Sequence, residues 1–80
     1  MLVITNKGAI MIPLALFEIG KNSSIKKING NDKVKRHLGE LGFVVGSPVK
    51  IVSVLYGNLI IQIKDSRIAL NRDTANKILV

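Results

Sequence analysis

The feature that most restricts the fold is a succession of three short apolar runs in the second half of the chain. The runs are rich in Val and Ile, and two polar breaks, Gly57-Asn58 and Asp65-Ser66, separate them. β-Branched runs divided by two such residues are typical of antiparallel strands joined by tight turns. The sequence therefore predicts a three-stranded antiparallel meander.

The two predicted turns also predict how the strands pair. If each break is a two-residue loop, apolar residues of all three strands fall on the same side of the sheet. The expected pairs are Tyr56 with Leu59, Val54 with Ile61, Val52 with Ile63, Ile63 with Ile68, and Ile61 with Leu70.

The opposite side of the meander keeps three apolar residues, Ile51, Leu55 and Ile60. Closure of the sheet into a barrel would bury them, because a barrel has no open face or free edge. Without closure they would form an exposed apolar patch, which a second copy of the chain could cover in a weak homo-oligomer. The sequence leaves both alternatives open.

A strand and a helix are predicted in the first half of the chain. Residues 23–29 read as the strand, because β-branched Ile25 and Ile28 lie there between polar neighbours and the stretch runs into Asn29-Gly30-Asn31. The helix begins next, since Asn31 or Asp32 can accept hydrogen bonds from its first turn. Apolar residues recur in it at helical spacing and form one face of the helix. The residues of that face are Val34, Leu38 and Leu41.

The ends of the helical segments are also predicted. Gly42 is expected to end the first helix in the left-handed conformation. Asn71 is expected to cap a short closing helix, with Ala75 and Ile78 on its inner face. Together the elements predict a mainly β fold, a small and strongly bent barrel with one helix after the first strand and a short C-terminal helical turn.

The 80 residues accommodate one domain, and its N-terminal stretch shares one feature with a targeting signal. Residues 9–17 form an apolar run after Lys7, but no small-x-small cleavage site follows and Pro13 interrupts the run. The run is also too short to cross a membrane. The sequence therefore favours a soluble protein, and Met11-Ile12-Pro13 reads as a plausible start, so we expect an N-terminal extension over residues 1–10 and a domain over residues 11–80.

Catalytic and metal-binding chemistry is sparse in this sequence. There is no Cys, which excludes disulfides and thiolate metal clusters, and the only histidine is His37. His37 and Glu40 are spaced at i and i+3 on the predicted helix, but two ligands do not make a metal site. The five carboxylates are scattered, so no general acid and base pair is expected. We expect no enzyme activity, no cofactor and no resident metal.

The charge predicts an anionic partner. Twelve Lys and Arg residues oppose five Asp and Glu residues, which gives a net charge of +7. Five of the basic residues gather around the first strand and helix: Lys26, Lys27, Lys33, Lys35 and Arg36. A nucleic acid is one candidate partner, but aromatic residues for base stacking are few. An acidic protein surface is the other.

Several segments resemble the FeoA family in order and spacing over residues 11–80. These segments are residues 25–32 (IKKINGND), Leu38, residues 40–46 (ELGFVVG), 49–54 (VKIVSV), 67–70 (RIAL) and 75–78 (ANKI). The resemblance implies an SH3-like small β-barrel and a non-enzymatic accessory role in bacterial ferrous iron uptake, exercised in the cytoplasm. It implies FeoB, a membrane permease with a cytosolic G domain, as the partner, and contact with the membrane only through that partner.

The resemblance also suggests where the partner binds. We expect Lys35, Arg36 and His37 on the helix to contact the permease, and Phe43 in the following loop to be an apolar anchor, with core packing as the alternative role of Phe43. The family usually has Arg at the position of His37, and here Arg36 stands one residue earlier. The related C-terminal domain of iron-dependent repressors is a further resemblance, but no DNA-binding helix-turn-helix precedes the pattern here.

Overall fold

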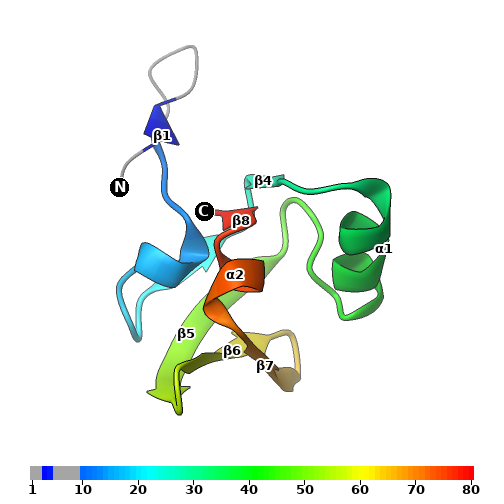
Figure 1. Ribbon diagram of the computed structural model, residues 1–80. Helices are drawn as coiled ribbons and strands as arrows, with labels where there is room; N and C mark the ends of the chain where they lie inside the picture. Colours follow the sequence, from blue (N-terminus) through cyan, green and yellow to red (C-terminus); the bar gives the residue numbers. More distant parts are fainter. Residues whose placement is uncertain (1–2, 5–9) are drawn as a thin grey trace.

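The computed structural model of the protein describes residues 3–4 and 10–80, and these form strands, two α-helices and one 3-10 helix (Figure 1). The strands are β1 (Val3–Ile4), β2 (Ile10–Met11), β3 (Asn22–Ser24), β4 (Lys27–Ile28), β5 (Pro48–Leu55), β6 (Asn58–Ile63), β7 (Ser66–Leu70) and β8 (Ile78–Leu79). The helices are the 3-10 helix η2 (Leu14–Leu16), α1 (Asp32–Glu40) and α2 (Arg72–Ala75). The predicted mainly β fold is confirmed.

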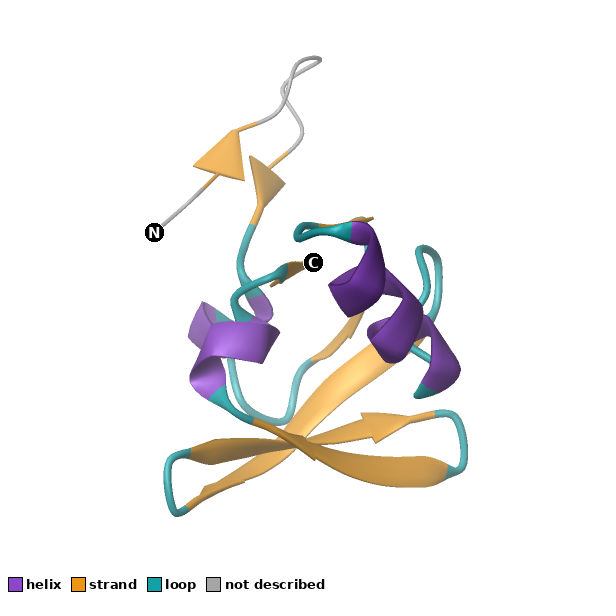
Figure 2. Cartoon of the chain, turned by 45° about the vertical axis from the view of Figure 1, so that its right-hand side comes forward, coloured by secondary structure: helices purple, strands orange, loops and turns teal. Residues whose placement is uncertain are grey.

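The largest sheet contains four antiparallel strands in the order β3-β5-β6-β7. Its last three strands are the predicted meander, which is confirmed. Two smaller antiparallel pairs, β1 with β2 and β4 with β8, complete the strand pairing. Figure 2 shows both α-helices lying over the same face of the four-stranded sheet.

The C-terminal strand β8 joins the beginning of the domain to its middle. Ile12 and Val80 each donate a backbone N–H to the carbonyl of the other, at 2.8 and 2.9 Å, and Pro13 bridges to Leu79. On its other side β8 pairs with β4. β8 therefore lies between β4 and residues 12–13, an arrangement that the sequence pattern did not predict.

The predicted register of the meander was wrong, because each loop lies one residue earlier than expected. Leu55 pairs with Asn58 and Ile63 with Ser66, so the first loop is Tyr56-Gly57. Both loop residues have a positive φ, 52° and 79°, as a type I′ turn requires. The glycine thus takes the second central position of the turn. Since the shift in pairing is two residues, side chains of β6 and β7 keep their predicted face.

A β-bulge in β5 changes which of its side chains face the core. The pairing shifts between Ile51 and Ser53, with Val52 as the extra residue. As a result Ile51 is buried, with 1% of its surface exposed, whereas Val54 and Tyr56 are 40% and 94% exposed. The predictions for these three residues were therefore wrong. Of the apolar patch expected on the opposite side, Leu55 is exposed and Ile60 is half-buried.

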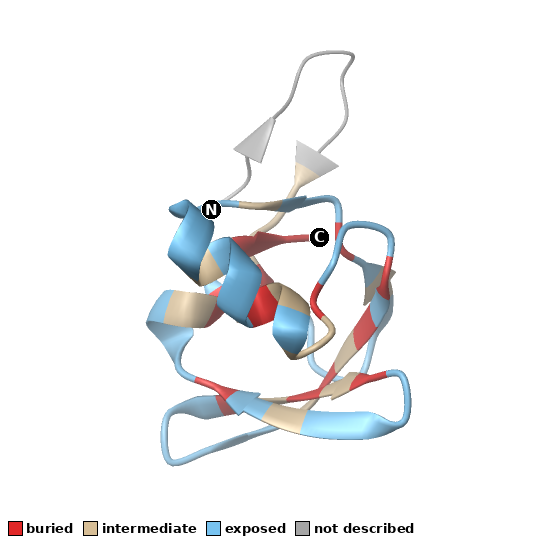
Figure 3. Ribbon diagram, turned by 90° about the vertical axis from the view of Figure 1, so that its right-hand side faces the viewer, coloured by how far each residue is buried: buried red, intermediate tan, exposed pale blue. Residues whose placement is uncertain are grey.

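The core lies between the concave face of the four-stranded sheet and the two helices. Its residues come from η2, both α-helices, the strands β5 to β8 and the segments between elements, and the burial colours of Figure 3 show buried positions along the sheet and helices. They are Leu14, Ile25, Leu38, Phe43, Val49, Ile51, Leu59, Ile61, Ile63, Leu70, Ala75, Ile78 and Val80. Among the described residues, no buried side-chain nitrogen or oxygen lacks a hydrogen-bond partner. With no disulfide to constrain the chain, this apolar core supplies the stability.

The predicted helix caps are confirmed. The Asn31 side chain accepts a hydrogen bond from the Val34 N–H at 2.9 Å at the start of α1, and the Asn71 side chain accepts one from the Thr74 N–H at 2.8 Å at the start of α2. Gly42, with φ at 101°, follows the C-cap of α1. Each cap satisfies a backbone donor that the helix leaves free.

The predicted strand over residues 23–29 is divided into β3 and β4, which belong to different sheets. The chain changes partner at Ile25, whose N–H donates to Ser47 O at 3.0 Å, while the next N–H, of Lys26, donates to Leu79 O at 2.8 Å. The prediction of one continuous strand was therefore wrong. The change of partner directs the chain from the sheet toward α1.

The Tyr56-Gly57 turn provides a test of the fold. A non-glycine residue in the left-handed region carries a cost of about 1–3 kcal/mol, and Asn tolerates this region better than Tyr. Tyr56→Asn is expected to raise the free energy of unfolding by about 1 kcal/mol in urea denaturation. Tyr56→Phe, which keeps the aromatic ring and the backbone preference, is the control and should leave stability unchanged. A Tyr56→Asn variant less stable than the wild type would contradict the left-handed conformation of residue 56 in this turn.

Candidate protein-docking surface

Helix α1 lies at the edge of the domain with most of its surface exposed (Figure 3). Leu38, fully buried, fixes the inward face. Lys35, Arg36 and His37 are all exposed, but successive residues of an α-helix are separated by about 100°. The three predicted contact residues therefore point in three directions, with Lys35 and His37 on opposite flanks of the helix.

Lys35 borders a hollow of about 400 Å³ between β4, α1 and the loop after α1. We call it the β4–α1 hollow. The residues that line it are Lys26, Lys27, Ile28, Lys35, Gly39, Phe43, Val44 and Val45. Arg36 and His37 lie outside this lining. The structure thus brings Lys35 together with two lysines from the predicted strand, and separates it from His37.

The loop that forms one wall of the hollow is held by backbone hydrogen bonds. Ser47 N–H donates to Val44 O at 3.0 Å across a turn in which Gly46 has a φ of 93°. Gly46 N–H donates to Ile25 O at 2.7 Å and Ile25 N–H to Ser47 O at 3.0 Å. Val44 and Val45 are consequently held at the surface, where 46% and 66% of them remain exposed.

Phe43 lies in the core, with none of its surface exposed. Its N–H donates to Leu38 O at 2.9 Å, which joins the loop to the end of α1. The structure therefore gives this side chain the packing role that was the alternative to a partner contact. The exposed apolar residues of the same loop are Val44 and Val45, which the sequence reasoning did not select.

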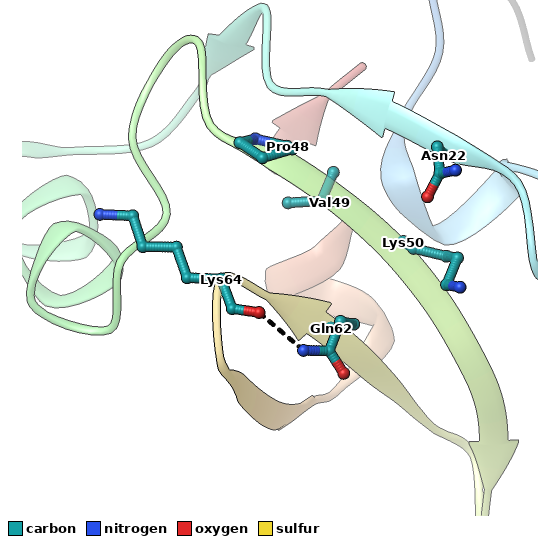
Figure 4. Close-up of a pocket in the computed structure, with 6 residues that line it drawn as sticks. All are labelled: Asn22, Pro48, Val49, Lys50, Gln62 and Lys64. Atoms are coloured by element: carbon teal, nitrogen blue, oxygen red, sulfur yellow. Dashed lines mark hydrogen bonds between the residues drawn. The ribbon is translucent and has the colours of Figure 1, made fainter.

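A second hollow, of about 210 Å³, lies on the outer side of the sheet (Figure 4). Its lining consists of Asn22, Pro48, Val49, Lys50, Gln62 and Lys64. Gln62 uses both ends of its amide, because Nε2 donates to Lys64 O at 2.7 Å and Oε1 accepts from Arg67 Nε at 3.0 Å. The pairing places Lys50, Gln62 and Arg67 in one row across three strands. This basic row was missed because the predicted pairs, Val54 with Ile61 and Val52 with Ile63, would put Ser53 and not Lys50 opposite Gln62.

Metal-ligating side chains are widely spaced in the structure. His37 and Glu40 are exposed one turn apart on α1. Over residues 3–4 and 10–80, no group of three or more His, Cys, Asp or Glu side chains could hold a metal ion. In the same residues, no helix has the length and apolar character needed to cross a membrane.

The fold and surface define a small mainly β domain with a polar helix on its flank beside an apolar hollow with a basic rim. The sequence model of the FeoA domain matches residues 12–80. The "Putative Fe(2+) transport protein A" of Methanocaldococcus jannaschii is 36% identical over 70 residues, which are 88% of this chain and 85% of that protein. The chain belongs to the FeoA family.

Solved structures of the same family share the fold. A crystal structure of the iron uptake regulatory protein FeoA superposes with a TM-score of 0.80 at 20% identity, over 88% of this chain and 95% of the other. The zinc-complexed FeoA of Stenotrophomonas maltophilia, described as a prokaryotic SH3 domain protein, superposes with a TM-score of 0.71 at 26% identity, over 88% and 87%. The predicted SH3-like fold is confirmed.

The two roles considered for Phe43 predict different consequences of its removal. Phe43→Ala is expected to cost about 3–5 kcal/mol, which is as much as a core of this size supplies, so the variant should be largely unfolded. Circular dichroism with thermal melting measures this. Val45→Ala, in the same loop, is the control and should change stability by less than about 0.5 kcal/mol. A folded Phe43→Ala protein with the wild-type midpoint would contradict the core role.

Proposed function

We propose that this protein is a non-enzymatic accessory protein of ferrous iron uptake that acts in the cytoplasm by binding the FeoB permease. The observation that carries the proposal is the match to the FeoA domain over residues 12–80. Two relatives support it. One bears the name of an Fe(2+) transport protein, and the other is described as a possible activating factor of bacterial ferrous iron transport.

The chemistry of the chain favours contact with a protein over transport of the ion. The chain has no Cys and a single His, and His37 with Glu40 offers only two of the ligands that a metal ion needs. An ion carrier would need a denser set of ligands. In this proposal the permease handles the iron, and the small domain acts on the permease through a surface contact.

The docking surface that we assign is the exposed side of α1 together with the β4–α1 hollow. Lys35 and Arg36 carry positive charge on this surface, and Lys26 and Lys27 extend it across the hollow. His37 extends the surface on the far flank of the helix. Positive charge in such a cluster favours an acidic region of the partner, increases the association rate and selects against basic partners.

Nucleic-acid binding is the second candidate function, and the basic row on the outer side of the sheet favours it. Lys50, Lys64 and Arg67 could neutralise phosphates there. Aromatic residues, on which single-stranded bases stack, are few, and the fully exposed one is Tyr56 at the tip of the β5–β6 hairpin. This function requires an affinity for RNA or DNA that falls steeply with salt. Absence of binding at low salt would dismiss it.

Charge reversal on α1 tests the proposed docking. Arg36→Glu is expected to weaken binding to the cytosolic part of the permease about tenfold or more, because it places a like charge against an acidic counterpart. Titration with the purified partner and co-purification with the whole permease both measure this effect.

The control for Arg36→Glu is Arg72→Glu, which makes the same change of charge at an exposed position of α2. It should bind like the wild type. If Arg36→Glu also binds like the wild type, α1 does not belong to the interface. If both variants lose affinity equally, net charge and not a particular surface governs the association.

A further inference from the structure

We propose that the β4–α1 hollow binds an acidic segment of the partner that inserts an apolar side chain against Gly39. The identity of the partner rests on the proposed function. The chemistry of the bound segment is inferred from the surface alone. We expect most of the binding free energy to come from contacts in the hollow, which lies on one flank of α1, and less of it from the remaining exposed side of the helix.

The hollow is an open depression of about 400 Å³ at the protein surface, and its lining suits a docking site. Ile28, Val44 and Val45 give it apolar walls, and Phe43 lies at its base. An apolar side chain placed there would remove the two exposed valines from water, which is favourable in proportion to the area covered.

The charge around the hollow specifies an acidic occupant. Lys26 and Lys27 stand on the β4 side and Lys35 on the α1 side, and no Asp or Glu is among the lining residues. Three lysines thus contribute to the lining of an apolar hollow. A segment with Asp or Glu on both sides of a large apolar residue matches this arrangement, whereas a neutral or basic segment does not.

Gly39 supplies an observation independent of the charge. It lies inside α1 with an ordinary helical φ, and a Cβ built on it would meet nothing within 4 Å. Neither its backbone conformation nor its neighbours in the free protein require a glycine here. Glycine is nonetheless the poorest helix former apart from proline. The open space over Gly39 lines the hollow, so we infer that it accommodates the bound side chain at close approach to the helix backbone.

The hollow is also preorganised. The hydrogen bonds that join Ser47 to Val44 and Gly46 to Ile25 hold the valine wall in place, and Asn31 caps the helix that forms the opposite wall. A site whose walls are already ordered loses less conformational entropy on binding. The structure therefore needs no rearrangement of its backbone to admit the segment.

The decisive variant fills the space over Gly39. Gly39→Leu is expected to lower the affinity for the permease's cytosolic part at least about tenfold, because the new side chain occupies the hollow. Its thermal midpoint should equal or exceed that of the wild type, since leucine favours the helix. Gly39→Ala is a second, milder variant, with a raised midpoint and a smaller loss of affinity. Calorimetric titration and thermal melting provide the two readouts.

The matched control is Glu40→Leu, which adds the same side chain one residue along α1 and outside the hollow. It should retain wild-type affinity or exceed it, because it also removes a negative charge from a basic surface. A weaker Glu40→Leu variant and an unaffected Gly39→Leu variant would overturn the proposal.

The charge requirement is tested with synthetic peptides. The probe is Glu-Asp-Leu-Leu-Glu-Asp, compared with a version in which Gln and Asn replace the acids and a version in which Ala replaces Leu. Only the first should bind, and Lys26→Glu with Lys27→Glu should abolish that binding, while Lys64→Glu with Arg72→Glu, two residues that do not line the hollow, should only weaken it. Equal binding of all three peptides, or displacement of the peptide by random RNA, would contradict the assignment.

The outcomes separate the inference from the proposed function. If the permease binds the wild type and Gly39→Leu equally, the hollow is not its site, although the docking function stands. If the permease does not bind but the acidic peptide does, with loss in Gly39→Leu, the hollow is an acidic-segment site and the proposed partner is wrong.

Discussion

The rest of the structure depends on how β5 bends at its bulge. β5 pairs with β3 through its first half and with β6 along its length, and the extra residue at Val52 changes the direction of its side chains between those halves. Val49 and Ile51 consequently enter the core, and the sheet curves beneath the helices. Leu38 and Phe43 fill the space above this curved face and fix the position of α1. The position of the candidate docking surface thus follows from one irregularity in one strand.

The sequence predicted those parts of the fold that have local causes. The meander, both asparagine caps and the glycine after α1 follow from neighbouring residues, and all were confirmed. The register was not predictable in the same way, because Tyr56 occupies a turn position where Asn or Gly is usual. The bulge leaves no local signal, since its cost and benefit depend on packing against strands distant in sequence. The change of sheet at Ile25 is also a tertiary effect, set by its bonds to Ser47 and Gly46.

The candidate site was predictable in its charge but not in its shape. The cluster of lysines around the first strand and helix was visible in the sequence, and Lys35 lines the hollow. Of the three adjacent helical residues that were expected to bind, however, only Lys35 lines the hollow, because successive helix positions are about 100° apart. The available signals for the hollow were a glycine inside a helix and two adjacent valines before Gly46. A glycine weakens the helix that contains it, and apolar residues beside a surface turn gain little from burial. Features that disfavour the free protein in this way are often found at functional sites.

We propose that the domain acts by receiving an acidic part of the permease beside α1. The most direct test is an NMR titration of the isotope-labelled full chain with the permease's cytosolic part. If the β4–α1 hollow is the docking site, the shift changes will concentrate on Lys35, Gly39, Val44 and Val45. Changes centred instead on the outer row of the sheet, at Lys50, Gln62 and Arg67, or the absence of any change at saturating partner, would contradict it.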